Sequence, residues 1–196
     1  MGKVIFDISM SLDGFITGPD PSPENPLGTG GIRLHDWWYA DKTENDARIA
    51  DEIMQTTGAM IASRRVYDES RWGERDPLGN PPGTHVPVFV ISHDVPEGMP
   101  ESGPVYTFVT DGLESALKQA RATAGDKNVH VIGGANIAQQ YLKAGQLDEI
   151  RIHLVPVLLG AGVRLFDHLE DQHIDLQTTR VIESKSAIHL SFRIVK

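Results

Sequence analysis

The chain has 196 residues, no cysteine and a formal net charge of −9 at pH 7. The lack of cysteine excludes disulfides, thiolate catalysis and cysteine-bound metals, and it fits a cytoplasmic protein. The acidic balance argues against nucleic acid as the main partner, because neutralising phosphates needs a basic face. We expect no membrane partner, since no run approaches the ~20 apolar residues of a membrane span and no signal-peptide pattern opens the sequence.

The first part of the chain predicts a strand, a long loop and a helix. Residues 3–10 alternate as a strand does. Residues 18–31 are rich in glycine and proline, and loops of this length in compact domains are usually functional or mobile. Helical spacing follows over 44–57, with Thr43 as the N-cap and Gly58 as the stop.

Strands and helices alternate through most of the remaining sequence. The expected strands are 59–62, 86–91, 105–109, 129–132 and 149–158, the expected helices are 63–67, 111–125 and 135–145, a second Pro/Gly-rich loop spans 73–83, and a hairpin pairs 176–183 with 187–195. This order predicts a single α/β domain over residues 1–196. Its fold class is a three-layer α/β/α sandwich with a mostly parallel mixed central sheet and an antiparallel C-terminal hairpin.

Three of the expected strand ends carry residues suited to phosphate. Gly133-Gly134 lies between a buried strand and the helix that opens at Ala135, where bare backbone N–H groups meet the positive end of a helix. The alternative is a tight turn that binds nothing. Ser63-Arg64-Arg65 and Ser92-His93 follow two other strands. Because ligands sit outside the carboxyl ends of parallel strands, the three ends together suit a cofactor with two separate phosphate groups.

Asp46 is the leading candidate for acid–base chemistry. It shares the apolar face of the helix 44–57 with Ala50 and Ile53, whereas carboxylates normally point to solvent. A carboxylate aimed at the core must be paired, hydrogen-bonded or functional. If Asp46 protonates a substrate, partial burial should raise its pKa. The alternative is that Asp46 is a solvated first-turn partner of the helix dipole.

Two tryptophans follow the long loop, at Trp37 and Trp38. They either anchor the loop by packing or form a wall on which a ligand ring stacks. The sequence leaves these two interpretations open.

Five motifs carry a resemblance that covers nearly the whole chain. They are SLDGFITG (11–18), ASRRVYDE (62–69), VFVIS (88–92), VIGGANIAQQYLKAGQLDEI (131–150) and HLVPVLLGAGVRLF (153–166). In this order they resemble the dihydrofolate reductase superfamily, in the branch of the C-terminal reductase domain of the bifunctional deaminase-reductases of riboflavin biosynthesis. The usual residues of the family differ at Ser63 (glycine), Val66 (threonine) and Ile132 (glutamate in the riboflavin-pathway reductases).

The resemblance implies NADPH as the cofactor and assigns roles by position. The positions are Ser63, Arg64, Arg65, Val66 and Ser92 for the adenosine 2′-phosphate, Gly133, Gly134, Ala135, Asn136 and Ile137 for the pyrophosphate, and Ser9 and Ile16 beside the nicotinamide. An unusual peptide between Gly133 and Gly134 is implied too, such as the cis bond of dihydrofolate reductases. Asp46 matches the acid of the substrate pocket, Asp13 is the next candidate acid, and Trp37 and Trp38 would close one side of the pocket. No metal is implied.

Two functions remain open from the sequence. The leading one is an NADPH-dependent reductase that transfers hydride to a small conjugated heterocycle, either a pyrimidine of riboflavin biosynthesis or a pterin. The second is a nucleotide- or small-ligand-binding protein on the same fold with little turnover. An inward-facing Asp46 favours the enzyme, since a binding protein has less need of a buried acid. The sequence also leaves a homodimer open as the oligomeric state.

Overall fold

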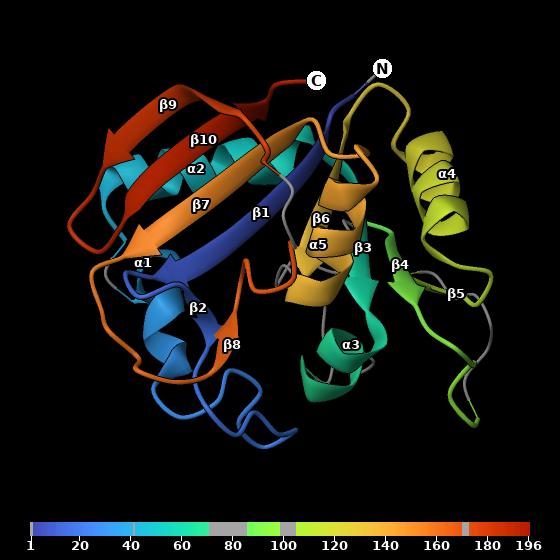
Figure 1. Cartoon of the computed structure of the whole chain (residues 1–196), viewed down its shortest axis with the longest axis horizontal. Helices are drawn as coiled ribbons and strands as arrows, with labels where there is room; N and C mark the ends of the chain where they lie inside the picture. Colours follow the sequence, from blue (N-terminus) through green and yellow to red (C-terminus); the bar gives the residue numbers. More distant parts are fainter. Residues whose placement is uncertain (1, 41, 71–85, 99–104, 170–172) are drawn as a thin grey trace.

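Eight strands form one central sheet in a computed structural model that describes residues 2–40, 42–70, 86–98, 105–169 and 173–196 (Figure 1). In spatial order they are Tyr106–Val109 (β5), Val88–Ile91 (β4), Thr57–Ser63 (β3), Asn128–Gly133 (β6), Val4–Ser11 (β1), Glu149–Val155 (β7), Ile188–Ile194 (β10) and Leu176–Glu183 (β9). The strands from β5 to β7 pair in parallel, and β10 and β9 add an antiparallel edge. The predicted mixed sheet with its C-terminal hairpin is therefore confirmed.

Helices cover both faces of the sheet. One face carries a 3-10 turn, Gly31–His35 (η1), and the helices Asp36–Tyr39 (α1), Glu44–Thr56 (α2) and Arg64–Ser70 (α3), while the other carries Leu113–Ala124 (α4) and Ala135–Lys143 (α5). In Figure 1, α5 lies in front of the sheet and α2 behind it. A small second sheet pairs Phe15–Thr17 (β2) with Val163–Arg164 (β8). The three-layer prediction is confirmed.

The two faces of the sheet differ in chemistry. Towards α4 and α5, the strands contribute apolar side chains such as Phe6, Ile61 and Ile152, which form the largest core cluster. Because successive side chains of a strand alternate between faces, the residues between them point towards α2. On β1 and β7 those residues include Asp7 and His153, which are buried polar groups. The α2 side of the central strands therefore encloses a polar layer.

Helix α2 begins as predicted but ends in a different way. Thr43 is the N-cap and forms a reciprocal capping box with Asp46. The prediction that Gly58 stops the helix is wrong, because β3 already begins at Thr57 and Gly58 lies within it. A glycine stands there because α4 passes so close that a Cβ on Gly58 would lie 2.8 Å from Cα of Ala124.

Several predictions about the remaining segments differ from the structure or lie outside the residues that it describes. Strand β7 stops at Val155 rather than at 158, because Pro156 has no N–H to donate to a ladder. The short elements η1, α1, β2 and β8 were not predicted. The expected loop 73–83 lies outside the described residues. No helix in the described ranges is long and apolar enough to cross a membrane.

Replacing Gly58 with alanine should destabilise the fold by about 1–3 kcal/mol, which is the usual range for overpacking a tight contact. The added methyl group would meet backbone atoms of Ala124, which cannot move aside as a flexible side chain can. Urea unfolding followed by circular dichroism measures the effect. Lys118→Ala, on the exposed side of α4, is the matched control and should change stability by less than about 0.5 kcal/mol. Equal stability of Gly58→Ala and the parent protein would show that α4 does not pack this closely.

Candidate functional site

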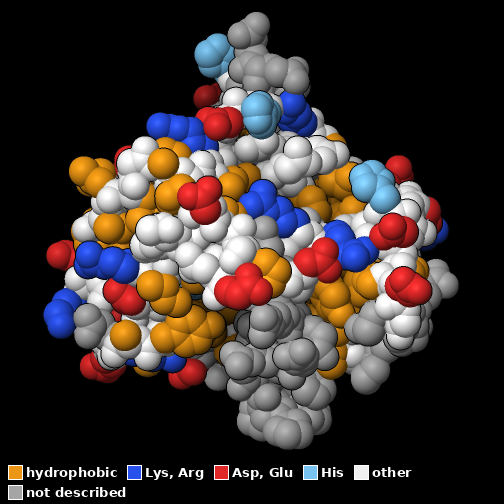
Figure 2. Space-filling view, turned by 90° about the horizontal axis from the view of Figure 1, so that it is seen from below, with side chains coloured by type: hydrophobic (Ala, Val, Ile, Leu, Met, Phe, Trp, Pro, Cys, Tyr) orange, Lys and Arg blue, Asp and Glu red, His pale blue; other side chains and the backbone are white. Residues whose placement is uncertain are grey.

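The carboxyl ends of the parallel strands meet at one edge of the molecule, which Figure 2 views directly. Acidic and basic side chains are interspersed there rather than separated into patches. Parallel pairing of β3 with β6 brings Ala62 beside Gly133. A Cβ on Gly134 would lie 3.8 Å from Ser63 Oγ, and one on Gly133 would lie 3.2 Å from Val66 Cγ2. Two of the predicted phosphate-binding segments are therefore neighbours in space.

The glycine turn leads directly into the N-terminus of α5. The peptide bond between Gly133 and Gly134 is cis, as the resemblance implies. Gly134 is the N-cap of α5, no side chain caps the helix, and its first turn holds no acidic residue. Ala135 and Ile137 are buried, which fixes the helix against the sheet, while Asn136 is exposed. Because the first N–H groups of a helix lack intrahelical partners, this end can accept an anion.

Arg64 occupies the next strand end, at the start of α3. Its Nη1 donates to Ser92 Oγ at 3.3 Å and to Asp94 Oδ1 at 2.9 Å, and its Nε donates to Asp68 Oδ1 at 2.8 Å. Hydrogen bonds from the guanidinium to Asp68 raise the pKa of Arg64, and Asp94 adds to this effect. Arg65 follows on the same helix with an exposed side chain. The structure thus joins the predicted Arg64 and Ser92, but it also places two carboxylates beside them that the sequence analysis did not include.

Trp37, in α1, packs against Ser9 of β1. Its indole is only 2% exposed, its Nε1 donates to Ser9 Oγ at 2.9 Å, and its ring lies 4.1 Å from that of His153. Trp38 is half-buried and meets Trp37 edge-on at 5.2 Å. Ile16, in β2, is buried in the main core cluster. Trp37 therefore packs into the protein, as the loop-anchoring interpretation predicts, and it touches the buried polar layer.

Asp46 faces inward, as its place on the helix predicted, and is fully buried. Its Oδ2 accepts hydrogen bonds from the backbone N–H of Thr43 at 2.8 Å and from Thr43 Oγ1 at 2.6 Å, while its Oδ1 lies 2.7 Å from His189 Nε2. The expected rise in its pKa is wrong. Burial does raise the pKa of Asp46, but the hydrogen bonds from Thr43, Ser184 and His189 together outweigh it and hold the pKa below its usual value. The catalytic role of Asp46 stays a prediction.

A cluster of buried histidines, which was not predicted from the sequence, lies beside Asp46. His153 and His189 face each other across β7 and β10, with their Nδ1 atoms 2.7 Å apart. His153 Nε2 lies 2.7 Å from Asp7 Oδ1, and His130 Nδ1 lies 3.6 Å from Asp7 Oδ2. Burial lowers the pKa of His130. The available signal was that each of these residues stands between two apolar residues in a stretch predicted to be a strand.

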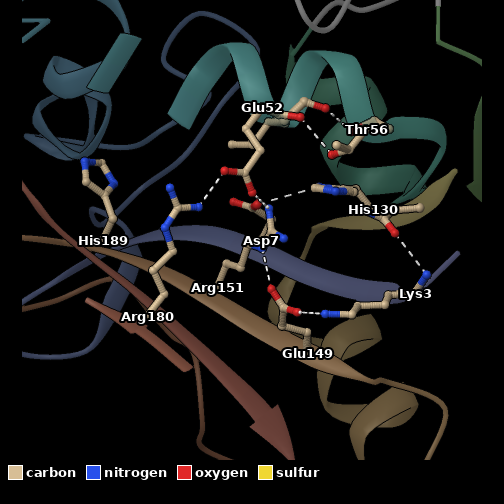
Figure 3. A network of polar contacts seen from close by, with 12 residues as sticks. Lys3, Asp7, Glu52, Thr56, His130, Glu149, Arg151, Arg180 and His189 are labelled. Atoms are coloured by element: carbon tan, nitrogen blue, oxygen red, sulfur yellow. Dashed lines mark hydrogen bonds and ion pairs between the residues drawn. The ribbon is translucent and has the colours of Figure 1, made fainter. Parts of the chain in front are cut away.

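Ion pairs continue this polar layer along the sheet beneath α2 (Figure 3). Arg151 bonds Glu149 through Nε at 2.6 Å and lies 3.4 Å from Glu52 on α2. Glu52 also accepts a hydrogen bond from Arg180 at 2.5 Å, and Lys3 pairs with Glu149 at 2.7 Å. A cavity of about 10 Å³ touches Glu52, Arg151, His153 and His189. Ion pairs thus run along much of the layer, but among the described residues both ring nitrogens of His130 and Asp7 Oδ2 have no hydrogen-bond partner. The cavity has room for about one water molecule.

Asp13 joins two loops at the edge of the site. Its carboxylate accepts hydrogen bonds from Ser11 Oγ at 2.6 Å, from the backbone N–H of Leu159 at 3.1 Å and from that of Gly160 at 2.7 Å. The bond from Ser11 and the two backbone N–H groups lower its pKa to about 2, against a smaller opposing effect of burial. A carboxyl group with so low a pKa is a poor proton donor at neutral pH. The geometry instead makes Asp13 the residue that fixes the β1–β2 turn to the loop after β7.

Comparison with known proteins relates the chain to one family. The family model described as the RibD C-terminal domain matches residues 2–190. The chain is 27% identical over 175 residues to the uncharacterised protein YwjB of Bacillus subtilis, covering 87% of this chain and 86% of that protein. It is 24% identical over 188 residues to YyaP of the same organism, covering 93% and 90% respectively.

Solved structures share the fold at low sequence identity. A putative riboflavin biosynthesis protein from Shewanella sp. PV-4 superposes with a TM-score of 0.70 at 23% identity, covering the whole of both chains. The riboflavin biosynthesis reductase Rib7 of Saccharomyces cerevisiae does so with a TM-score of 0.61 at 11% identity, covering 99% of this chain and 90% of that one. At these identities the likeness concerns the fold.

The stability that Asp13 contributes should depend on pH in a defined direction. Because folding lowers its pKa from 3.8 to about 2, the ionised carboxylate stabilises the fold above about pH 4, and this contribution is lost as the pH falls towards 2. Asp13→Asn should therefore melt at a lower temperature than the parent protein at pH 7, and the difference should shrink as the pH approaches 2. Thermal unfolding across that range measures it, with exposed Asp111→Asn as the control. A difference that stays constant with pH would contradict the role assigned to the carboxylate.

Proposed function

The chain belongs to the RibD C-terminal domain family, and we propose that it is an NADPH-dependent reductase that transfers hydride to a small conjugated heterocycle. The observation that carries the proposal is the meeting of two anion-suited segments at one edge of the sheet. The uncapped N-terminus of α5 lies beside Ser63 and Val66, and Arg64 follows at the next strand end with Ser92. The two solved structures named above carry riboflavin biosynthesis in their names, which supports the substrate class.

The cofactor would bind along these strand ends. Its pyrophosphate would accept hydrogen bonds from the N–H groups of Ala135, Asn136 and Ile137, since no protein side chain caps them. The 2′-phosphate would lie against Arg64, where it must compete with Asp94 and Asp68. Asp94 is largely exposed and Asp68 is about half exposed, so water screens their attraction and a doubly charged phosphate can displace them. The donors in this region therefore fit a phosphorylated dinucleotide.

NADPH supplies hydride when it is bound, and the residues of the chain would orient the reactants and manage the proton. The nicotinamide would sit near Ser9, which Trp37 holds through its indole N–H. Trp37 also covers His153 and His189, so it keeps bulk water from the buried polar layer. Asp46 is the acid proposed for the reaction. Because its pKa is held below the usual value, it would have to receive the proton from its partner His189 before passing it on. Asp46 is fully buried in this structure, so a substrate would reach it only if the segments that cover it move.

A second candidate function has one observation in its favour. Asp46 is fully buried and both of its oxygens already accept hydrogen bonds, as they would in a protein that binds a nucleotide without turning over a substrate. The two functions separate in a simple assay. A reductase oxidises NADPH when a suitable pyrimidine or pterin is added, whereas a binding protein holds the nucleotide without consuming it.

Titration of the protein with NADPH and with NADH tests the cofactor assignment. We expect tighter binding of NADPH, because only NADPH carries the 2′-phosphate that Arg64 would contact. Arg64→Ala should weaken NADPH binding by roughly 10- to 150-fold, which corresponds to the loss of about 1.5–3 kcal/mol from a charge-assisted contact. NADH binding should change little.

Two further variants make the cofactor test specific. Asp94→Asn removes the carboxylate that competes for Arg64 Nη1, so NADPH should bind at least as tightly as in the parent protein. Arg33→Ala, an exposed arginine on η1, controls for the loss of one positive charge. The cofactor assignment fails if the two cofactors bind equally or if Arg64→Ala leaves the affinity for NADPH unchanged.

A separate assay tests for turnover. It measures whether the protein oxidises NADPH when 5-amino-6-(5-phosphoribosylamino)uracil or a dihydropterin is added.

A further inference from the structure

Four buried side chains form one continuous row of hydrogen bonds through the polar layer. Asp7 Oδ1 meets His153 Nε2, His153 Nδ1 meets His189 Nδ1, and His189 Nε2 meets Asp46 Oδ1, each at 2.7 Å. These side chains come from β1, β7, β10 and α2, and none is more than 8% exposed. Trp37 covers both imidazole rings. We refer to these four residues as the proton chain.

The geometry fixes the number of protons in the proton chain. Each of the three contacts is short enough to be a hydrogen bond, and each therefore requires one proton between its two atoms. Without a proton between them, the two Nδ1 atoms would direct lone pairs at each other, and with two protons they would direct N–H groups at each other. The row therefore holds three protons. With two carboxyl groups and two imidazoles, three protons give it a net charge of −1.

We propose that Asp7, His153, His189 and Asp46 act as a single proton store, in which two ionised carboxylates bracket a histidine pair that shares one extra proton, and that this store supplies Asp46 with the proton for the proposed reduction. The inference rests on the proposed function and names the proton source of the same site. His153 and His189 are positioning residues, since they act through Asp46.

Two ionised carboxylates flank the histidine pair. Hydrogen bonds hold the pKa of Asp46 low despite burial, and contacts with His153, His130 and Arg151 do the same for Asp7, so both carboxylates are ionised at neutral pH. Burial, and then repulsion from His153, lower the pKa of His189, while its contacts with Asp46 and the charge of Asp7 oppose this lowering. The extra proton is therefore inferred from the three short contacts and depends on the two flanking carboxylates. The other titratable or charged groups that face the pair are His130, Glu149, Arg151, Glu52, Arg180 and His35.

The proton can reach Asp46 without movement of any heavy atom. The Nε2 proton of His189 moves to Asp46 Oδ1, and the proton between the Nδ1 atoms stays on His189, which leaves two neutral imidazoles and a protonated Asp46. In the proposed reduction, hydride from NADPH bonds to the acceptor carbon and breaks the conjugated π bond, whose electron pair passes to the heteroatom. That heteroatom takes the proton of Asp46, and NADP⁺ leaves.

After this step the proton chain holds two protons and a charge of −2, with the Asp46 carboxylate facing a bare Nε2 of His189. This state is unfavourable, so the row takes one proton back from water. The cavity of about 10 Å³ that touches both histidines has room for about one water molecule and offers a route for that proton. One turnover therefore consumes one proton from solvent and restores the original row.

Nitrogen-15 NMR of the histidine-labelled protein, without cofactor or substrate, tests whether the proton chain holds the shared proton. We expect one strongly downfield proton that couples to the Nδ1 atoms of both His153 and His189, together with protonated Nε2 atoms on both rings. Asp46→Asn removes one negative charge from the proton chain, which weakens the attraction for the shared proton. The variant should therefore lose this proton at a pH at least one unit lower than the parent protein does. Asp51→Asn, an exposed acid on the same helix, should leave that pH unchanged.

Two results would overturn the proton store. One is a pair of histidines with ordinary neutral tautomers and no coupling between their Nδ1 atoms. The other is an Asp46→Asn variant that keeps the folded structure and loses the shared proton at the same pH as the parent protein. Either result leaves the cofactor assignment standing, since the nucleotide would bind at other strand ends. If NADPH failed to bind, the proposed reductase function would be wrong, but the NMR result on the shared proton would still stand.

Discussion

The parallel pairing of β1 with both β6 and β7 is the constraint on which the rest of the molecule depends. It places β1 at the centre of the sheet, so the carboxyl ends of its neighbours reach the same edge. The pairing also sets which side chains share a face. Ser9 lies beside His153, and Asp7 lies beside Arg151, because the two strands are in this register. A slip of one residue would direct Asp7 and Ser9 into the apolar layer beneath α5.

The polar layer beneath α2 has an energetic cost that an apolar core would avoid. Removing charged groups from water costs several kcal/mol per ion unless close partners compensate, and apolar replacements of similar shape are often as stable or more stable. Here Glu149, Arg151 and Glu52 compensate one another, and Asp46 forms hydrogen bonds with Thr43 and His189. Because stability alone does not explain such a layer, its place beside Ser9 and Trp37 supports a role in the chemistry of this edge.

The sequence predicted the sheet better than it predicted the site. The spacing of apolar residues and the positions of turn residues were sufficient to predict the strands and the helices α2, α4 and α5, because these elements bury clear apolar faces. The prediction that α2 ends at Gly58 was wrong because a glycine can mark close packing against another element as well as the end of a helix. Only the position of α4 distinguishes the two cases. The histidine pair was missed because His153 and His189 are 36 residues apart and meet only through strand pairing. Asp46 was identified correctly as inward-facing, but its partner was unknown, so the direction of its pKa shift was predicted wrongly.

A crystal structure of the protein with NADP⁺ bound would test the central claim, which is that the strand ends around Gly134 and Arg64 hold the cofactor. The account predicts the pyrophosphate within hydrogen-bonding distance of the N–H groups at the start of α5, the 2′-phosphate against the Arg64 guanidinium, and the nicotinamide next to Ser9. A nucleotide bound elsewhere would contradict the account, and so would one bound with its adenosine end at Ser9 and its nicotinamide at Arg64.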